Sequence, residues 1–567
     1  MTLESKRKWI LPTKVYGVEN VVESILRKRN ITDTEKFFSS DPKDIPSPSK
    51  LHNTDLASKK ILEHIEKNSK IVIHGDFDCD GICATSILWD FLYRDLSKYL
   101  GKKVDVVPYI PSRIDQGYGL TKSSLEDILN LGGDLVISVD CGVRDFDLIA
   151  EYRKKGLDFV VTDHHQPPSN FPKRLSYPLV HQAYPKHEYP YSEICGSAVA
   201  FLLVQRIKEL VGMDGGIDEN TKGLDLVGLA TVSDIMPLTG VNRIFVKLGL
   251  TQMRKGSRKG LNYLISKAKI DAKMLNSYHL GYVIAPRINA SGRIGSAIEG
   301  VKLLVSESNS MCEKIALDLE RLNLERQKMT EDILNNSQKQ LDENDLGKII
   351  FVLGEDWHEG VIGLVAGKLL EMYHRPVLVT TNNNGLVKGS ARSISGFNIT
   401  DALEKSSNYL ERYGGHELAA GFTLKYENVS SFRDSLVDYA NDKITETMLE
   451  DKALEPDVVV DTDDIGVLLL DSLSKLEPFG YANPRPVIAL TELIVFKKQV
   501  IGVEKNHMKL VVKGDGIDLL TLTLFNCQED ISKINENSVI DVVGYPSANV
   551  WNGRENVEFN VREWKFH

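Results

Sequence analysis

Four short apolar runs, separated by segments of helical periodicity, constrain the fold of this chain more than any other feature. The runs are Lys70–His74, Val104–Tyr109, Asp134–Val139 and Asp158–Thr162. Because strands that alternate with helices pair in parallel and are covered on both faces, the pattern predicts a doubly wound parallel sheet in an α/β domain. Sheets of this kind bind their ligands at the carboxyl ends of the strands.

Clusters of carboxylates and imidazoles are found where three of these runs end. They are His74 with Asp76, Asp78 and Asp80, then Asp140, and then Asp163-His164-His165. Carboxylates crowded in this way are normally tolerated only when cations neutralise them. Oxygen ligands with some imidazole favour Mn²⁺ or Mg²⁺, and two such ions ~3.5–4 Å apart can polarise a phosphate and generate hydroxide. Together with Asp234 further along the chain, the clusters predict hydrolysis of a phosphate ester at two metal ions.

The three residues of the third cluster, Asp163-His164-His165, can have different roles. His164 is predicted to bind metal, His165 to contact the scissile phosphate, and Asp163 to orient a neighbouring imidazole. An isolated aspartate would more often be a helix cap, and Asp80 with the glycine after it precedes a helix predicted to begin near Ile82. An isolated histidine pair would more often be an exposed turn. Repetition of the pattern after three strands favours the metal site over both alternatives.

Cysteine usage and hydropathy restrict the compartment. Six cysteines without a CxxC pair are typical of reduced thiols in a cytosolic protein. Cys79, Cys83 and Cys141 lie within the candidate site, where hard carboxylate neighbours favour small buried hydrophobes over zinc ligands. The N-terminus lacks the apolar run of a secretory signal, and the most apolar stretch, 194–204, is shorter than the ~18 residues of a membrane span. We expect a cytoplasmic protein with no membrane segment.

The charge distribution gives two indications. The net charge of -10, from 69 basic and 79 acidic residues, argues against a protein that coats nucleic acid indiscriminately. Between Arg243 and Lys273, however, nine basic residues accompany the single acid Asp271. This run is either a surface that contacts phosphates or a solvated helical face.

The rest of the chain indicates further domains, since 567 residues predict about three or four. Apolar residues at steps of three, four or seven predict one helix from roughly Asn309 to Leu341, about 50 Å long, as a connector between two lobes. A strand-helix-strand pattern and an asparagine-rich turn at 382–385 predict a second α/β domain. Its elements are Lys348–Leu353, Val361–Tyr373 and Val377–Thr380.

After Asp451 the hydropathy pattern changes, and it predicts short strands in which apolar and polar residues alternate. They are Pro486–Phe496, Met508–Lys513, Asp518–Phe525, Val539–Val543 and Asn556–Val561. Five strands in roughly a hundred residues predict a small β-barrel, and the OB-fold is one such barrel that often binds single-stranded nucleic acid.

Nine segments spread over nearly the full length carry a family resemblance. They are HGDFDCDGICAT (74–85), SVDCG (138–142), TDHH (162–165), ATVSDIMPL (230–238), PRINASGRIG (286–295), DWHEGVIGLVAGKL (356–369), GSARS (389–393), YGGHELAAGF (413–422) and LEPFGYANPRP (476–486). In these motifs and their order, the chain resembles the RecJ family of single-strand-specific exonucleases in the DHH phosphoesterase superfamily. Three departures from the family pattern, Cys79, Ala285 and Ala482, remove no proposed ligand.

The resemblance implies a domain plan and a division of the metal ligands. The plan is an N-terminal extension (1–50), a DHH catalytic domain (51–305), a connecting helix (306–345), a smaller α/β DHHA1 domain (346–450) and an OB-like β-barrel (451–567). His74 and Asp78 would hold one ion, Asp80, His164 and Asp234 the other, and Asp140 would bridge the two. Asp76 and Asp163 would be supporting acids, and His165 would lie at the phosphate.

The resemblance also implies a set of substrate-binding residues. Arg287, Asn289 and Arg293 would bind the strand, Ser390 and Arg392 a 5'-terminal phosphate, and Tyr118 a terminal base by stacking. Gly414, Gly415 and His416 would grip the substrate phosphate, with the two glycines allowing close backbone approach. Buried salt bridges or core packing are the alternatives for the strand-binding residues, the Ser390–Arg392 pair and Tyr118, and a simple β-turn is the alternative for the glycines.

We therefore expect a Mn²⁺- or Mg²⁺-dependent exonuclease that degrades single-stranded DNA from its 5' end to 5'-mononucleotides in recombination and repair. The expected partners are single-stranded DNA, a single-strand-binding protein and a helicase, and the chain is expected to be a monomer. Two alternatives stay open: a DHH phosphoesterase of nanoRNA, cyclic dinucleotides or bisphosphates, and a non-catalytic replication scaffold. The barrel and the basic run favour a polymer substrate, and the complete ligand set favours catalysis.

Overall fold

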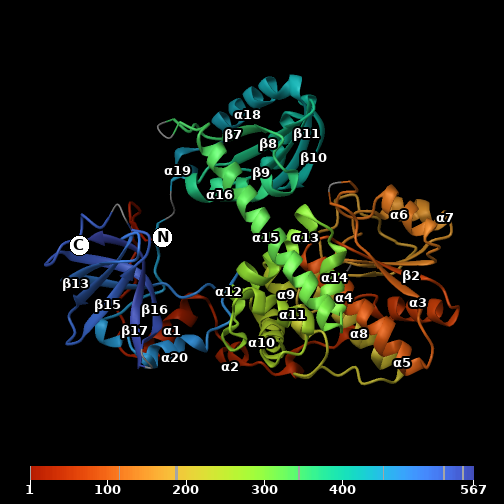
Figure 1. The fold of residues 1–567 in the computed structure, drawn as a ribbon, viewed down its shortest axis with the longest axis horizontal. Helices are drawn as coiled ribbons and strands as arrows, with labels where there is room; N and C mark the ends of the chain where they lie inside the picture. The colour runs from red at the N-terminus through yellow and green to blue at the C-terminus, as the bar shows by residue number, and fades with distance from the viewer. Residues whose placement is uncertain are drawn as a thin grey trace. The chain divides into compact units, whose positions relative to one another are not determined.

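The computed structural model describes residues 2–113, 115–184, 189–342, 345–450, 453–527, 530–551 and 554–567. Residues 343–344 of the predicted connecting segment, and the predicted domain boundary at 451, lie outside the described residues. The chain divides into two compact units, Ser40–Glu450 and the combination of Met1–Ser39 with Asp451–His567, each of which is described by itself (Figure 1). None of the described helices has the length and apolar character needed to cross a bilayer.

The first domain of the larger unit is built on a parallel sheet of five strands. Their spatial order is β3 (Val106–Tyr109), β2 (Ile71–Gly75), β4 (Leu135–Val139), β5 (Asp158–Thr162) and β6 (Leu179–Val180). Alternate residues of β4 face opposite cores, since Ile137 packs in one hydrophobic cluster and Val136 in another. The four predicted strands and the doubly wound architecture are confirmed, with β6 as an addition.

Helices cover both faces of this sheet. The elements are α3 (Thr54–Glu66), α4 (Cys79–Asp90), α5 (Ser97–Leu100), α6 (Lys122–Asn130), α7 (Phe146–Lys154), α8 (Gly196–Val211), α9 (Leu224–Ser233), α10 (Gly240–Lys255), α11 (Lys259–Lys267), α12 (Ser277–His279), α13 (Ala285–Ile294) and α14 (Ile298–Val305). Helix α4, which follows β2, packs in the cluster on one face, and α7, which follows β4, packs in the cluster on the other. The chain therefore leaves β2 and β4 in opposite directions, which makes the crevice between these strands a topological switch point.

A long helix leads to the second sheet of the same unit. It is α15 (Asn309–Gln338), which agrees with the predicted connector to within three residues at its C-terminus. The sheet has the order β10 (Leu410–His416), β11 (Ala419–Lys425), β9 (Leu386–Arg392), β8 (Val377–Asn383) and β7 (Ile350–Glu355). Only β7 and β8 are parallel, and the predicted hairpin is β8–β9. Its helices are α16 (Glu359–Tyr373), α17 (Ile399–Lys405), α18 (Val429–Lys443) and α19 (Glu446–Leu449).

The smaller unit contains a closed five-stranded barrel. Its strands are β13 (Ile488–Ile501), β14 (His507–Lys513), β15 (Leu519–Leu524), β16 (Val539–Trp551) and β17 (Arg554–Phe566). Pairing runs from β13 through β14, β15, β17 and β16 back to β13, so the sheet closes on itself. All five predicted strands and the barrel are confirmed.

The first 39 residues belong to this barrel unit. Strand β1 (Leu3–Glu4) pairs with β17. Residues of α1 (Val18–Lys28) and α2 (Thr34–Phe38) pack in the barrel core beside α20 (Val467–Ser474), and β12 (Val458–Val459) pairs with β13. The structure thus joins the start of the chain to its end, whereas the predicted domain plan treated 1–50 as a separate extension.

Candidate metal centre and phosphate pocket

The register of the parallel strands places the acidic clusters side by side at the carboxyl edge of the sheet. Gly75 at the end of β2 pairs with Val139 of β4, and Val139 pairs with Thr162 of β5. The residue after each of these three is an aspartate: Asp76, Asp140 and Asp163. Asp140 adopts φ 61°, a left-handed conformation that is uncommon for a residue other than glycine and is often found at functional sites.

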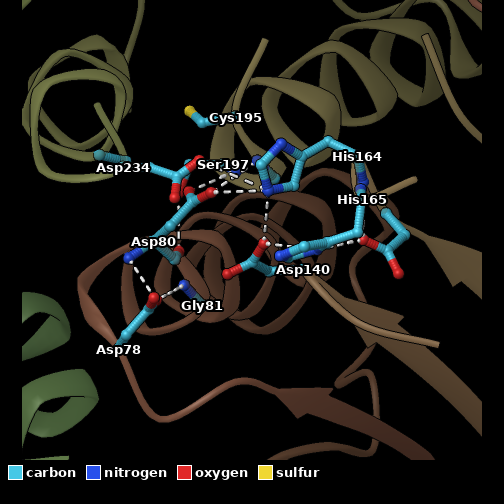
Figure 2. Close-up of polar contacts among 12 residues, drawn as sticks. Asp78, Asp80, Gly81, Asp140, His164, His165, Cys195, Ser197 and Asp234 are labelled. Carbon is cyan, nitrogen blue, oxygen red and sulfur yellow. Dashed lines mark hydrogen bonds and ion pairs between the residues drawn. The ribbon is translucent and has the colours of Figure 1, made fainter. Parts of the chain in front are cut away.

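Two acids of the first cluster are held by helix N-termini (Figure 2). Asp78 caps α4, with its Oδ1 accepting hydrogen bonds from the amides of Asp80 (2.9 Å) and Gly81 (3.1 Å). Asp80 accepts hydrogen bonds from the first amides of α8, at 2.6 Å from Gly196 and 2.7 Å from Ser197. The cap expected as an alternative is therefore present, at Asp78. Each of these carboxylates accepts two hydrogen bonds from backbone amides, and since a carboxylate has about four lone pairs, others stay free for a cation.

His164 points into the centre of the acids (Figure 2). Its Nε2 lies 3.1 Å from Oδ1 of Asp140, 3.5 Å from Oδ2 of Asp234 and 3.9 Å from Oδ2 of Asp80. His165 is held differently, because its Nδ1 lies 2.9 Å from Oδ1 of the fully buried Asp163. Asp163 also accepts hydrogen bonds from the amides of the histidine pair and of Val143, so it fixes the whole turn.

Three sets of donor atoms are close enough to share an ion. They are Asp140 with His164 and His165, Asp80 with His164 and Asp234, and Asp76 with Asp78 and Asp140, and within each set the ligand atoms lie within 4.8 Å of one another. His74 is outside these sets, although it is fully buried at the end of β2, 3.7 Å from Sγ of Cys141.

Unsatisfied polar atoms test whether metal ions fit here. Five buried atoms of this site have no hydrogen-bond partner within the described part of the chain: Nε2 of His74, Oδ1 of Asp76, Oδ1 of Asp140, Nε2 of His164 and Oδ2 of Asp234. Buried polar atoms are rarely left this way in proteins, and cations shared within the three sets would satisfy the atoms of Asp76, Asp140, His164 and Asp234. Hard oxygen donors with imidazole suit Mn²⁺ or Mg²⁺. These donors fit the two predicted cations.

The electrostatics of the cluster support the same conclusion. Burial, followed by repulsion from neighbouring carboxylates, raises the pKa of Asp76, Asp78, Asp140 and Asp234. Burial lowers the pKa of His74 to about 4, which keeps that imidazole neutral and able to bind a metal. For His165, the hydrogen bond and charge of Asp163 outweigh burial and raise the pKa. The cluster thus disfavours its own charge unless cations are bound.

A cavity of about 510 Å³ is lined in part by Arg113, whose guanidinium interacts with the charges of Asp76 and Asp78. Its walls come from both α/β domains of the larger unit and include Arg113, Arg293, Ser390 and Arg392. Burial and the charge of Arg113 lower the pKa of Arg293 to about 10 and that of Arg392 as well. Three guanidinium groups that repel one another in a partly dry cavity make a strong site for an anion such as phosphate.

Arg113 was not predicted from the sequence. It lies in the loop after β3, and its guanidinium stacks 4.9 Å from the ring centre of Phe77, between the metal cluster and the cavity. The signal that could have found it is its position five residues before Tyr118, in a loop that leaves the same sheet edge. The Tyr118 hydroxyl donates to the carbonyl of Asp140 (3.2 Å) and lies 3.1 Å from Nδ1 of His165.

Other predicted substrate residues lie outside the cavity walls. Arg287 is paired with Glu320 of α15, the salt bridge foreseen as an alternative. Asn289 accepts a hydrogen bond from the amide of Cys79 (2.7 Å) and so supports the metal loop. Neither residue lines the cavity.

The glycine-histidine triplet lies on the hairpin β10–β11. Nε2 of His416 lies 3.3 Å from Nη2 of Arg144, which connects the triplet to the loop after Asp140. An added Cβ at Gly415 would lie 2.3 Å from the carbonyl oxygen of Ala419, so that glycine serves the hairpin itself, whereas Gly414 faces open space.

Some residues of the basic run form ion pairs with acids of the protein, and others are exposed to solvent. Arg258 is buried against Asp225, with Nε 2.6 Å from its Oδ2. Further acids from other segments face Lys255, Lys259 and Lys267 at 3.4–3.8 Å. Only part of the run, including the exposed Lys269 and Lys273, is available to phosphates.

Three family domains match the chain in the predicted order. Residues 70–231 match the DHH family, N-terminal domain, residues 346–442 the DHHA1 domain and residues 456–563 the RecJ OB domain. The single-stranded-DNA-specific exonuclease RecJ of Bacillus subtilis is 32% identical over 99% of this chain and 71% of its own length.

Solved structures agree. RecJ from Thermus thermophilus in complex with Mn²⁺ is similar with a TM-score of 0.81 and 27% identity, over 98% of this chain and 79% of that one. The complex of the same protein with Mg²⁺ has a TM-score of 0.76 and 26% identity, over 98% and 78%. Domain order, sequence identity and structure agree, and the chain belongs to the RecJ family.

Proposed function

We propose that this protein is a single-stranded-DNA exonuclease that hydrolyses nucleotides from the 5' end in DNA recombination and repair. One observation carries the proposal: a set of metal-donor atoms lies near a cavity with four arginines and a serine among its lining residues, and one of these arginines, Arg113, interacts with the charges of Asp76 and Asp78. The names of the relatives, single-stranded-DNA-specific exonucleases, give the substrate class.

The residues of the cavity support the proposed 5' polarity. A terminal phosphate has two negative charges near neutral pH and presents three oxygens, whereas an internal phosphodiester has one charge. Arg113, Arg293 and Arg392, with Ser390 beside them, suit the terminal group better. A 5'-phosphate bound there would leave the next phosphodiester over the acids, and the product would be a 5'-mononucleotide.

The residues of the site would share the chemistry. Divalent cations held by His74, Asp78, Asp80, Asp140, His164 and Asp234 would neutralise the phosphate and lower the pKa of a water molecule. His165, whose pKa is raised by Asp163, would donate a hydrogen bond to a phosphate oxygen as negative charge develops. Asp76 would support the loop, and Tyr118 would orient His165 and offer its ring to the terminal base.

The rival is a phosphoesterase of small substrates, which would use the same metal-donor set. The barrel favours the polymer, because OB barrels are a common platform for single strands. A non-catalytic scaffold is disfavoured because each proposed metal ligand is present.

Labelled oligonucleotides test the proposal. Time courses with 5'-label and 3'-label, each with Mn²⁺ or Mg²⁺, should release labelled mononucleotide at once from the 5' end and shorten the 3'-labelled strand step by step. Release from the 3' end, equal cleavage of blunt duplex, or faster turnover of a dinucleotide than of a long strand would contradict it.

The finer expectations for partners belong to the same proposal. We propose a cytoplasmic monomer that receives its strand from a helicase and a single-strand-binding protein. Light scattering of the purified protein and stimulation of digestion by those two partner classes are the measurements that check these points.

A further inference from the structure

Two tyrosines form an exposed stacked pair on the larger unit. Tyr278 is 61% exposed and Tyr282 is 75% exposed. Their ring centres lie 5.1 Å apart, with 26° between the ring planes. Large aromatic side chains usually gain stability by burial, so a stacked pair left open to solvent calls for a ligand with a flat, apolar face.

The pair lies at the start of a helical segment that ends in the candidate site. Helix α12 continues through one π-helical stretch, Leu280–Ile284, into α13. Along this segment, Asn289 supports the metal loop through the amide of Cys79, and Arg293 lines the phosphate cavity. The order along the helix is therefore phosphate cavity, metal loop and tyrosine pair.

The segment that carries the pair also packs close to a metal donor. A Cβ added at Gly281, one residue before Tyr282, would lie 3.2 Å from Val232, so this segment packs against the end of α9, two residues before the donor Asp234. The residue after Asp234, Ile235, is 69% exposed and has φ 56°, an unusual conformation for a β-branched side chain. An exposed apolar side chain thus directly follows a metal donor near the segment that carries the tyrosines.

The chemistry of the surroundings selects the ligand. Lys269 and Lys273 are exposed on the segment before the tyrosines, and cations beside stacked aromatic rings are the usual combination in single-strand-binding grooves. We propose that Tyr278 and Tyr282 form a base-stacking platform for the part of the single strand that follows the scissile phosphate. This proposal rests on the proposed function.

Helix geometry locates the nucleotides concerned. At ~1.5 Å per residue, Tyr282 and Tyr278 lie about 10 and 16 Å from Asn289 along the axis. At a stacked spacing of about 3.4 Å, these distances correspond to about three to five nucleotides. The platform would hold the strand in register while the 5' end occupies the cavity.

Substrate length is the first test. The double variant Tyr278→Ala/Tyr282→Ala should bind and digest an oligonucleotide of about 20 nucleotides at least about tenfold less efficiently, seen in KM more than in kcat. A substrate of about two nucleotides, too short to reach the platform, should be digested as by the unsubstituted chain. Tyr278→Phe/Tyr282→Phe keeps the rings and should restore long-strand binding. Tyr426→Ala, which removes a 50% exposed tyrosine on the second α/β domain, is the matched control.

Abasic substitutions give the second test. An abasic site about three to five nucleotides from the 5' end should weaken binding to the unsubstituted chain but have little further effect on the double alanine variant. Equal loss on short and long strands, or additive effects of variant and abasic site, would overturn the platform. A change of oligomeric state in the variant with unchanged DNA binding would instead identify an interface between copies of this chain. No digestion of any strand by the unsubstituted protein would refute the proposed function itself.

Discussion

Replacing Asp140 by asparagine probes the charge balance of the metal centre most directly. Oxygens of Asp76, Asp78 and Asp140 lie within 4.8 Å of one another, and Asp140 is only 2% exposed. At an effective dielectric constant of about 20, two full charges no farther apart than this repel by at least ~3.5 kcal/mol. Since raised pKa values let the metal-free protein reduce this repulsion by taking up protons, we expect a stability gain of about 1–2 kcal/mol from the substitution. Asparagine also tolerates the left-handed backbone found at this position.

Thermal unfolding without Mn²⁺ measures the cost of carboxylate repulsion, and unfolding with Mn²⁺ measures the stabilisation by bound metal. Without metal, Asp140→Asn should unfold at the same or a higher temperature than the unsubstituted chain. With Mn²⁺ at about one hundred times Kd, the unsubstituted chain should gain ~2.7 kcal/mol per site, and the variant should lose most of that gain. Its nuclease rate should fall by more than the roughly 10- to 100-fold typical of residues that only support a metal ligand.

Asp158→Asn is the matched control, because Asp158 begins β5 at the opposite edge of the same sheet and pairs with Lys60. It should leave the Mn²⁺-dependent gain unchanged. The reasoning fails if Asp140→Asn lowers the stability of the metal-free protein and still gains as much from Mn²⁺.

Three other substitutions test separate features. Arg392→Ala should reduce digestion of 5'-phosphorylated strands by about 10- to 100-fold and that of 5'-hydroxyl strands much less. Arg287→Ala should keep the preference for 5'-phosphorylated strands. Equal losses by Arg392→Ala on 5'-phosphorylated and 5'-hydroxyl strands would refute the phosphate pocket. Gly81→Ala places a Cβ 2.5 Å from the backbone of the metal loop and should abolish Mn²⁺ binding. At Gly367 an added Cβ has no atom within 4 Å, so Gly367→Ala should leave the stability unchanged or raise it by up to ~1 kcal/mol. An Mn²⁺ titration of Gly81→Ala that matches the unsubstituted chain would contradict the expectation for the metal loop. Burial raises the pKa of Asp145 to about 6 from 3.8, so its contribution to stability is present below pH 3.8 and is lost as pH rises through 6. Because the residue is only partly buried, Asp145→Asn should become more stable than the unsubstituted chain by ~1 kcal/mol above that window, and equal denaturant midpoints at all pH values would exclude the effect.

Local hydropathy patterns were sufficient to predict four strands of the first sheet and the five strands of the barrel. Strands β2, β4 and β5 are buried on both faces and read as continuous apolar runs, and the barrel strands alternate with period two. Since parallel strands place their carboxyl ends at one edge, the position of Asp76, Asp140 and Asp163 followed from the sequence as well.

Contacts between distant segments could not be read in this way. The pattern of the basic run left a phosphate-contacting surface and a solvated helical face open, and part of the run instead faces Asp225 and other acids from elsewhere in the chain. Arg287 resembled a strand-binding residue and is paired with Glu320, 33 positions away. Arg113 carried no motif of its own, and only the closing of the two α/β domains around one cavity gives it a role.

By itself, the sequence determined the kinds of element and the domain order, and it predicted the metal-donor residues at the sheet edge. Only the tertiary structure decided that residues 1–39 complete the barrel unit, which arginines meet around the cavity, and that two exposed tyrosines lie on the helix that leads to it. The physical reason is the range of the interactions. Periodicity and capping act between residues a few positions apart, whereas charge pairing and cavity formation depend on side chains that meet only after the chain has folded.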